Sequence, residues 1–310
     1  MLENTFTERK NTFRENKVVW KNRRTGIMFI LPWLIGFAIF SIYPIITSFY
    51  YSFTEYNILK PPQWIGLGNY IQLLNDDPLF WKSLYNTLYY AVFSLPLGMV
   101  VSLVLAMLLN TKIKGLAIYR TIFYMPTIVP AVASSILWMW LLDPQMGIIN
   151  AALSYIGIKG PAWLVDPAWA KPALILMSLW GVGGSMVIYL AGLQDVPEEL
   201  YESAELDGAT WWPKIWHITL PMISPTIFFN LIMGLIGSFQ YFTQAYIMTG
   251  GGPMDSTLFY SLHLFNNAFR YYHMGYASAM AWILFIIILA ATLLVFKTSA
   301  RWVYYGGTNQ

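Results

Sequence analysis

The chain has 310 residues, of which 57% are hydrophobic, 17% aromatic and only 11% charged. Soluble domains carry about 25% charged residues, so a soluble protein of this size is excluded. A net charge of +3 gives no bulk basic character for binding nucleic acid. The absence of cysteine excludes disulfides, a thiolate nucleophile and cysteine-ligated metals. The composition predicts a membrane protein.

Uncharged apolar segments recur along the chain after a polar start that lacks the apolar core of a cleavable signal peptide. At ~1.5 Å per residue, about 20 helical residues cross the hydrocarbon core. The predicted spans are 27–50, 84–109, 121–142, 172–192, 219–248 and 276–296. The fold class is therefore predicted as all-α and polytopic, with six transmembrane helices. The predicted divisions are a tail at 1–25, a transmembrane domain at 26–298 and a tail at 299–310.

The distribution of lysine and arginine predicts the orientation, because these residues are enriched in cytoplasmic loops. With the N-terminus inside, most of the 18 basic residues lie on the cytoplasmic side. The five that fall outside are Lys60, Lys82, Lys159, Lys171 and Arg270. Both termini are therefore expected in the cytoplasm.

The predicted spans contain no Asp, Glu, Lys or Arg, and Lys171 lies at the edge of one of them. Proton-coupled transporters carry an ionisable residue inside the membrane, so this class is disfavoured, whereas sodium held by backbone carbonyls stays open. His263 and His273 have no acidic residues clustered with them, so we expect surface histidines and no metal site. A membrane enzyme or a passive scaffold is also disfavoured, since the spans offer only scattered hydroxyls for catalysis.

Neutral hydrogen-bonding residues follow one face of the fifth span. Asn230, Gly234, Ser238 and Tyr241 lie at i, i+4, i+8 and i+11. Small residues permit close approach, and Tyr or Trp offers a flat apolar face with a polar tip. The stripe favours a pathway for an uncharged polyhydroxyl solute, and helix–helix packing is the alternative.

The predicted cytoplasmic segment 193–217 carries six acidic residues and a single lysine, Lys214. An anionic inner leaflet would repel it. We expect a short helix capped by Asp195 and stopped at Gly208, then a second helix capped by Thr210. An apolar face formed by Leu200, Ala204 and either Tyr201 or Leu206, flanked by acids, fits a basic-rimmed groove on a partner protein. An ordinary solvated loop is the alternative.

The same segment carries an extended motif. Glu202-Ser203-Ala204, three residues, Gly208, nine residues and Ile218-Thr219-Leu220-Pro221 match the E-A-A-x3-G-x9-I-x-L-P signature of binding-protein-dependent ABC importer permeases. Ser203 is the single departure. Over nearly its whole length, the chain resembles the carbohydrate branch of this family, on the side of the larger maltose-importer permease and its lactose, glycerol-phosphate and oligosaccharide relatives.

The resemblance implies a type I ABC importer transmembrane fold in the bacterial cytoplasmic membrane. The implied partners are a second, similar permease in a pseudo-twofold heterodimer, two ABC ATPase subunits and an extracytoplasmic solute-binding protein. ATP is hydrolysed by the partner subunits, so no cofactor is expected in this chain. The implied ATPase-coupling residues are Glu202, Ser203, Ala204, Gly208, Ile218, Leu220 and Pro221.

The resemblance also implies where the transported solute is contacted. The maltose-type contact positions fall on Trp180, Gly181, Gly184, Gly234 and Ser238, with Thr127 and Ala131 from the third span. Tyr241 joins them from the stripe described above. The predicted function is import of a neutral sugar or oligosaccharide. The alternative is a phosphorylated polyol such as glycerol-3-phosphate, which ranks lower because the predicted spans hold no fixed cation.

Overall fold

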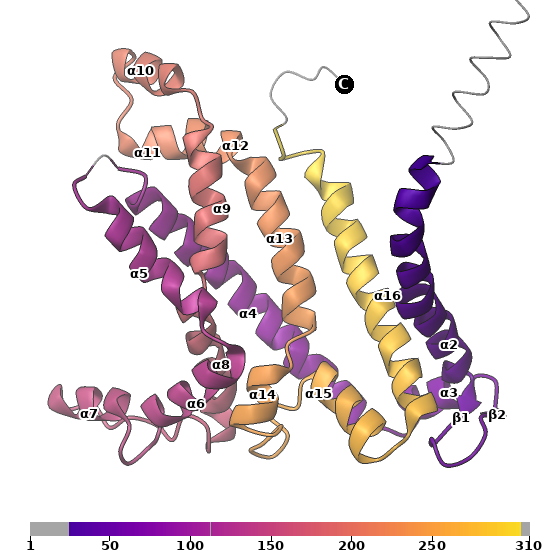
Figure 1. Cartoon of the computed structure of the whole chain (residues 1–310). Coiled ribbons are helices and arrows are strands. Elements are labelled where there is room, and N and C mark those ends of the chain that lie inside the picture. The colour runs from indigo at the N-terminus through magenta and orange to yellow at the C-terminus, as the bar shows by residue number, and fades with distance from the viewer. Residues whose placement is uncertain (1–24, 112, 305–310) are drawn as a thin grey trace, which may run out of the picture.

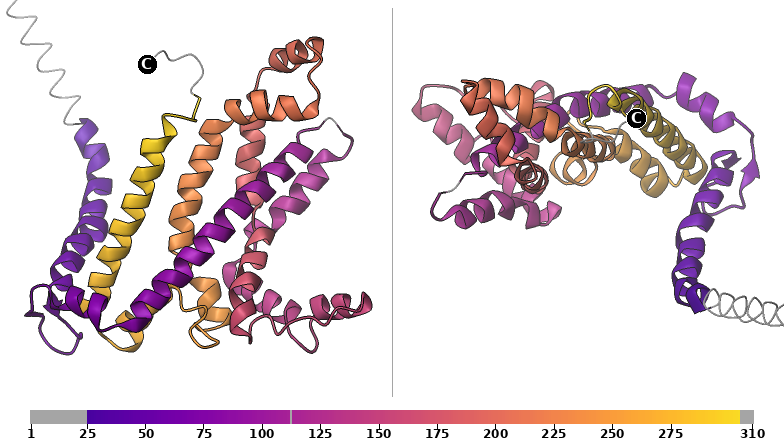
Figure 2. Two further views of the ribbon diagram at one scale, coloured as in Figure 1. Left: turned by 180° about the vertical axis from the view of Figure 1, so that it is seen from behind. Right: turned by 90° about the horizontal axis from the view of Figure 1, so that it is seen from above.

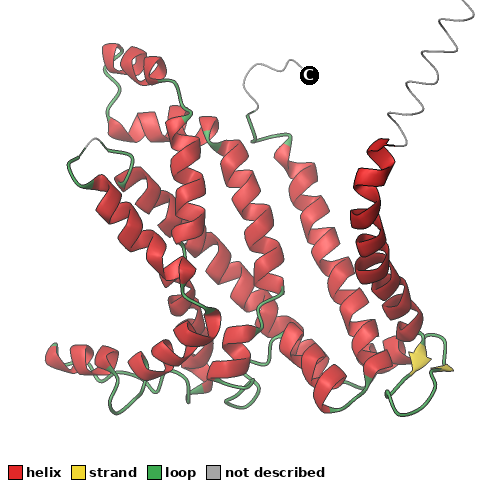
Figure 3. Cartoon of the chain, in the orientation of Figure 1, coloured by secondary structure: helices red, strands yellow, loops and turns green. Residues whose placement is uncertain are grey.

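The computed structural model describes residues 25–111 and 113–304, so most of the two predicted tails lies outside the described residues. Nearly all regular structure is helical, as Figure 3 shows. Two short strands, β1 (Thr54–Glu55) and β2 (Gln63–Trp64), pair antiparallel with Thr54 opposite Trp64. The all-α prediction is therefore confirmed for the described part of the chain.

Four helical segments of the described chain are long and apolar enough to cross a membrane without a break. They are Thr25–Ser52, Pro78–Leu108 (α4), Ser224–Met248 and Met274–Ser299 (α16). The first contains a π-helical turn, η1 (Ala38–Ile42), before α2 (Tyr43–Ser52), and the third comprises α13 (Ser224–Phe239) and α14 (Thr243–Met248).

The helix α4 begins six residues earlier than the predicted span. The Asp77 side chain accepts hydrogen bonds from the backbone N–H groups of Leu79 (2.9 Å) and Phe80 (3.2 Å). Asp77 is therefore the N-cap, and Pro78 occupies the first helical position, where its missing N–H costs nothing.

The span predicted over 121–142 is not one straight helix. The structure has α5 (Leu116–Ile128) and α6 (Ala131–Leu141) at an angle of 99°. Val129 is extended, as a residue before proline prefers, so the chain turns at Pro130. The fourth span is also bent, by 48°, between α8 (Pro167–Trp180) and α9 (Gly183–Gln194). Counting each bent pair as one span gives six.

Short helices lie at both ends of the bundle (Figure 1). One end, here called the α10 end, carries α10 (Glu198–Leu206), α11 (Trp211–Lys214), η2 (Ile215–Thr219) and α12 (Leu220–Met222). The opposite end, called the α7 end, carries α3 (Gly68–Asn75), α7 (Ile148–Tyr155), α15 (Tyr260–Phe265) and η3 (Asn266–Arg270).

The buried residues form three clusters rather than one central core. One joins α4, α8 and α14, the second joins α4 to α15 and α16, and the third joins α4, α9 and η2. The segment Thr25–Ser52 stands to one side of this body in Figure 2 and packs mainly through α2 on α16, with further contacts from Ser52 to Asn69 and Tyr70 of α3. The long helix α4 is thus the common element on which the other helices are assembled.

Candidate functional site

A cavity of about 220 Å³ lies where α4, the bent α8–α9 pair and α13 meet. All four residues of the predicted stripe line it: Asn230, Gly234, Ser238 and Tyr241. Across the cavity, α8 and α9 contribute Ser178, Gly181 and Ser185. Every lining residue is uncharged, so the polar groups of the cavity are hydroxyls and an amide, set among aromatic and aliphatic side chains.

A second cavity, of about 390 Å³, adjoins the first at the bend between α5 and α6. It is lined by the predicted residues Thr127, Ala131, Trp180, Gly181 and Tyr241. Gly184 lines neither cavity. It faces α5, because a Cβ added there would lie 3.5 Å from the methyl group of Thr127. The structure thus brings seven of the eight predicted pathway residues to two neighbouring cavities, and their role stays a prediction.

Tyr90 and Tyr241 form the boundary between the two cavities, since both residues line both of them. Their rings stack with centroids 4.1 Å apart and planes at 27°. Tyr90 is 4% exposed. The sequence reasoning missed Tyr90 and its neighbours on α4. The signal was present, since Asn86, Tyr90, Ser94 and Gly98 repeat every four residues and so share one helix face.

The acidic segment forms the expected short helix with one difference at its start. Asp195 follows α9 as its C-terminal residue, and Pro197 precedes α10, so the prediction of Asp195 as N-cap was wrong. The N-cap is the residue directly before the first helical residue, and Asp195 lies three positions before Glu198. Gly208 has φ +78°, the left-handed conformation that glycine adopts without strain. Its N–H donates to the Glu205 carbonyl (3.0 Å), which confirms the predicted stop.

Tyr201 and Glu205 attach this helix to the rest of the molecule, and Glu205 does so through an ion pair with Lys214 of α11. The Tyr201 hydroxyl is hydrogen-bonded to Thr219 Oγ1 (2.9 Å), and its ring packs on the third buried cluster. Leu206 is 90% exposed. The free apolar face of α10 therefore includes Leu206 and excludes Tyr201, which settles the choice that the sequence left open.

The motif residues divide into two structural groups. Glu202, Ser203 and Gly208 are exposed, and Ala204 is half-buried. Ile218 and Leu220 pack against the third cluster, beside Pro221 near the start of the fifth span. Thr210 precedes α11 as predicted, but its side chain makes no capping hydrogen bond.

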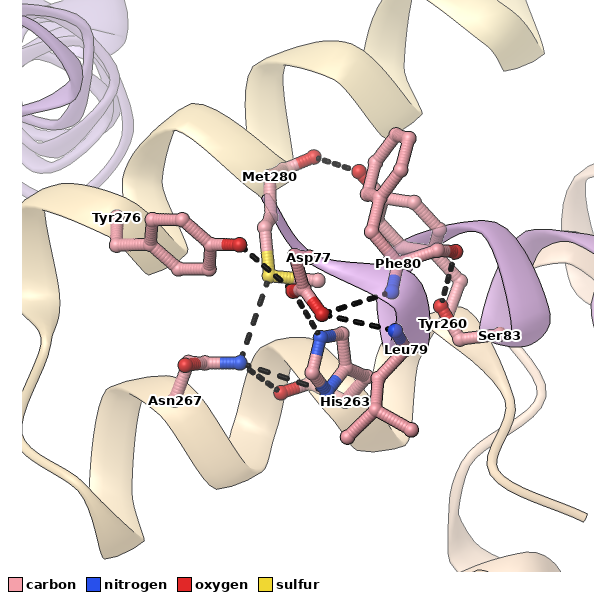
Figure 4. Close-up of polar contacts among 9 residues, drawn as sticks. All are labelled: Asp77, Leu79, Phe80, Ser83, Tyr260, His263, Asn267, Tyr276 and Met280. Atoms are coloured by element: carbon pink, nitrogen blue, oxygen red, sulfur yellow. Dashed lines mark hydrogen bonds and ion pairs between the residues drawn. The ribbon is translucent and has the colours of Figure 1, made fainter. Parts of the chain in front are cut away.

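Near the α7 end, the structure overturns the expectation for His263. This residue is 5% exposed, and its Nε2 lies 2.9 Å from Asp77 Oδ2 (Figure 4). Asp77 also accepts a hydrogen bond of 2.6 Å from the Tyr276 hydroxyl. Burial acts to raise the pKa of Asp77, but hydrogen bonds from Tyr276 and His263 outweigh it and hold that pKa below its ordinary value. His263 is therefore a buried partner of an acid 186 residues away, which sequence clustering could not reveal.

Within the described residues, no group of three or more His, Asp or Glu side chains could hold a metal ion. Residues 79–304 match the family described as "Binding-protein-dependent transport system inner membrane component". The chain belongs to this family. It is accordingly a transport permease and an integral membrane protein.

Two curated relatives match nearly the whole permease. It is 43% identical over 299 residues to the "Probable ABC transporter permease protein YesP" of Bacillus subtilis (strain 168), covering 95% of this chain and 96% of that protein. It is 35% identical over 281 residues to the "Lactose transport system permease protein LacF" of Rhizobium radiobacter, covering 87% and 92%.

A solved structure gives the same fold. A chain of the bacterial alginate ABC transporter, crystallised in complex with an alginate pentasaccharide-bound periplasmic protein, matches with a TM-score of 0.79 and 27% identity. The match covers 91% of the permease and 97% of that chain. The permease therefore has the type I ABC importer transmembrane fold.

Proposed function

We propose that the permease is the transmembrane subunit of an ATP-driven importer of a sugar or oligosaccharide. The observation that carries this proposal is the pair of cavities lined by uncharged polar and aromatic residues on both sides of the Tyr90–Tyr241 stack. Hydroxyl and amide groups match the hydroxyls of a sugar, and tyrosine or tryptophan faces match the apolar face of its ring.

The named relatives favour the same class of substrate, since one is a lactose permease and the structural neighbour belongs to an alginate transporter. A phosphorylated polyol fits the two cavities less well than a neutral sugar does. Its dianionic phosphate requires cationic or multiple hydrogen-bond donors, and neither cavity holds a cation. The neutral lining is suited to neutral sugar units.

The proposed assembly follows from the two ends of the bundle. Seven of the 18 lysine and arginine residues precede Thr25, whose helix begins at the α10 end, and this supports a cytoplasmic position for that end. There, exposed Glu202 and Leu206 on α10 offer an acidic and apolar surface to an ATPase subunit. A second permease would complete the pathway, and a binding protein would deliver the sugar at the α7 end. The bacterial cytoplasmic membrane is the proposed location.

The test is ATP hydrolysis by the complete complex in proteoliposomes, with a panel of binding proteins preloaded with different glycans. Stimulation by a glycan-loaded protein, accompanied by uptake of that glycan, is the expected result. Stimulation only by a phosphorylated polyol would replace the sugar by the alternative substrate. Failure to recruit any ATPase would refute the role of α10.

A further inference from the structure

Lys171 lies inside helix α8 and not at the edge of a span, where the sequence placed it. Its ammonium nitrogen donates to Asn86 Oδ1 on α4 (2.9 Å). The same nitrogen lies 4.9 Å from the ring centroid of Tyr89 and 5.0 Å from that of Tyr85. In the described part of the chain, no carboxylate forms an ion pair with Lys171. A cation within a span thus has two aromatic rings and one amide around it but no counter-ion.

The position of this cation relative to the cavities follows from helix spacing. Asn86 precedes Tyr90 by four residues on the α4 face that lines the first cavity, a rise of about 6 Å. Lys171 precedes Ser178, another lining residue, by seven residues or about two turns of α8. Both steps lead toward the α7 end, where α4 and α8 begin. Lys171 and Asn86 therefore continue the two lined faces beyond the first cavity, toward the α7 end.

Neither lipid contact nor bracing of Asn86 explains the charge. An ionisable residue within a span is costly against acyl chains and faces the interior or a water-filled space. The Asn86 side-chain NH2 already donates to the carbonyls of Asp255 (2.8 Å) and Leu258 (3.1 Å), so Asn86 is held without Lys171. A lysine ammonium has three donor hydrogens, and Asn86 accepts one. Among the described residues, the other two donors have no oxygen acceptor and are next to the rings of Tyr85 and Tyr89.

Lys82, which lies on α4 four residues before Asn86, provides a contrast with Lys171. Its ammonium donates to the Met254 carbonyl (2.7 Å) and lies 3.8 Å from Asp255 Oδ2. Its charge is thus offset within the chain, whereas the charge of Lys171 is not.

We propose that Lys171, with Tyr85 and Tyr89, forms a subsite on the α7 side of the first cavity for the carboxylate of an acidic sugar unit. This inference rests on the proposed function and specifies its substrate class. The ammonium makes a charge-assisted hydrogen bond to the carboxylate. Tyr85, which is 60% exposed, offers a face for the pyranose ring that carries it. A pyranose ring that carries a carboxylate is a uronate unit. Neutral units of the same oligosaccharide then bind in the uncharged cavities.

The test is equilibrium dialysis of three probes against the purified complete complex: trigalacturonate, its carboxyl-reduced neutral trimer and glycerol-3-phosphate. The wild-type complex is expected to bind trigalacturonate about tenfold more tightly than the neutral trimer, the scale of one charge-assisted contact. Lys171→Met should abolish this preference while leaving neutral-trimer binding within about twofold, and Lys171→Arg should retain it. Lys82→Met, the matched control, should retain it as well.

Several outcomes would overturn the subsite. An equal loss of the preference for trigalacturonate in Lys82→Met would indicate attraction by a diffuse positive field. Equal binding of both trimers by the wild-type complex would show that the carboxylate is not recognised. If the complex bound glycerol-3-phosphate through Lys171 but did not bind trigalacturonate, a phosphorylated polyol would be the ligand of this site. Disassembly of the Lys171→Met and Lys171→Arg complexes would indicate a partner carboxylate instead. Uptake of a neutral glycan despite any of these results would preserve the proposed function.

Discussion

The imidazole of His263 lies 2.9 Å from the carboxylate of Asp77, although 186 residues separate them along the chain. Asp77 caps α4, His263 belongs to α15, and the third partner, Tyr276, belongs to α16. A single carboxylate therefore joins three helices at the α7 end of the bundle, as Figure 4 shows. The contact fixes where α4 begins and so helps to set the position of every residue that α4 presents to the cavities.

Replacing Asp77 by Asn should destabilise the permease. The amide keeps the shape of the side chain but loses the charge-assisted hydrogen bonds with Tyr276 and His263, which contribute about 2–3 kcal/mol. Thermal unfolding of the purified complex should show a lower midpoint. The exposed neighbour Asp76 supplies the control, since Asp76→Asn should leave the midpoint unchanged. Equal midpoints for both variants would contradict the structural role of Asp77.

Acid should weaken the same cluster. Because the pKa of Asp77 is held below its ordinary value of 3.8, the stabilisation is fully present above that value and is lost as the pH falls through the lower folded-state pKa. Thermal midpoints recorded from about pH 7 down to about pH 3 should show a steeper acid decline for the wild type than for Asp77→Asn. Parallel declines would assign the acid sensitivity to other groups.

Gly208→Pro should uncouple sugar uptake from ATP hydrolysis. Proline fixes φ near about −65°, which is incompatible with the +78° observed, and it removes the N–H that bonds to Glu205. Gly157→Pro is the matched control. Gly157 has φ +76° and donates to the Ser154 carbonyl at the α7 end, away from α10. Normal uptake by Gly208→Pro would count heavily against docking of an ATPase on this loop.

A larger side chain at Gly181 should obstruct the path without disturbing packing. Gly181 lines both cavities, and a Cβ added there meets only the Ser178 carbonyl, at 3.7 Å. Gly181→Leu is therefore expected to reduce uptake at least about tenfold, the effect of a barrier raised by about 1.4 kcal/mol, in a complex that still assembles. Gly26→Leu, at another open helical position, should have no effect. Full uptake by the Gly181→Leu variant would show that the solute does not pass Gly181.

Tyr241 and Trp180 test whether aromatic faces serve transport or packing. Tyr241→Ala removes the stack on Tyr90, and Trp180→Ala removes the edge contact with Trp138. Uptake should fall while assembly, measured by size-exclusion chromatography, is preserved. Tyr241→Phe keeps the ring and should retain most of the uptake. Loss of the assembled complex in the alanine variants would identify these residues as packing groups.

The sequence was sufficient where the determining interactions are local. The four residues of the stripe on the fifth span share one cavity because helical periodicity places them on one face. The glycine stop at 208 is likewise a local requirement of the backbone.

Features that depend on tertiary structure could not be predicted in the same way. Hydropathy shows that 121–142 is apolar throughout but carries no information about the direction of each half, so the sequence predicts the span and not its 99° bend. Likewise, neither Asp77 nor His263 indicates its partner, because only the assembled helices bring them together. Lys171, which the sequence places at the edge of a span, lies inside α8 because this helix begins at Pro167, five residues before the predicted start.

The break at Val129–Pro130 has a consequence for the surrounding lipid. The 13 residues of α5 rise only about 20 Å, whereas the hydrocarbon core of a bilayer is about 30 Å thick. Wherever α5 meets lipid, the acyl chains must shorten or tilt to match the short helix, whereas the 31 residues of α4 rise about 46 Å, enough to cross the full thickness. Lipids with shorter acyl chains are expected to gather at such a contact.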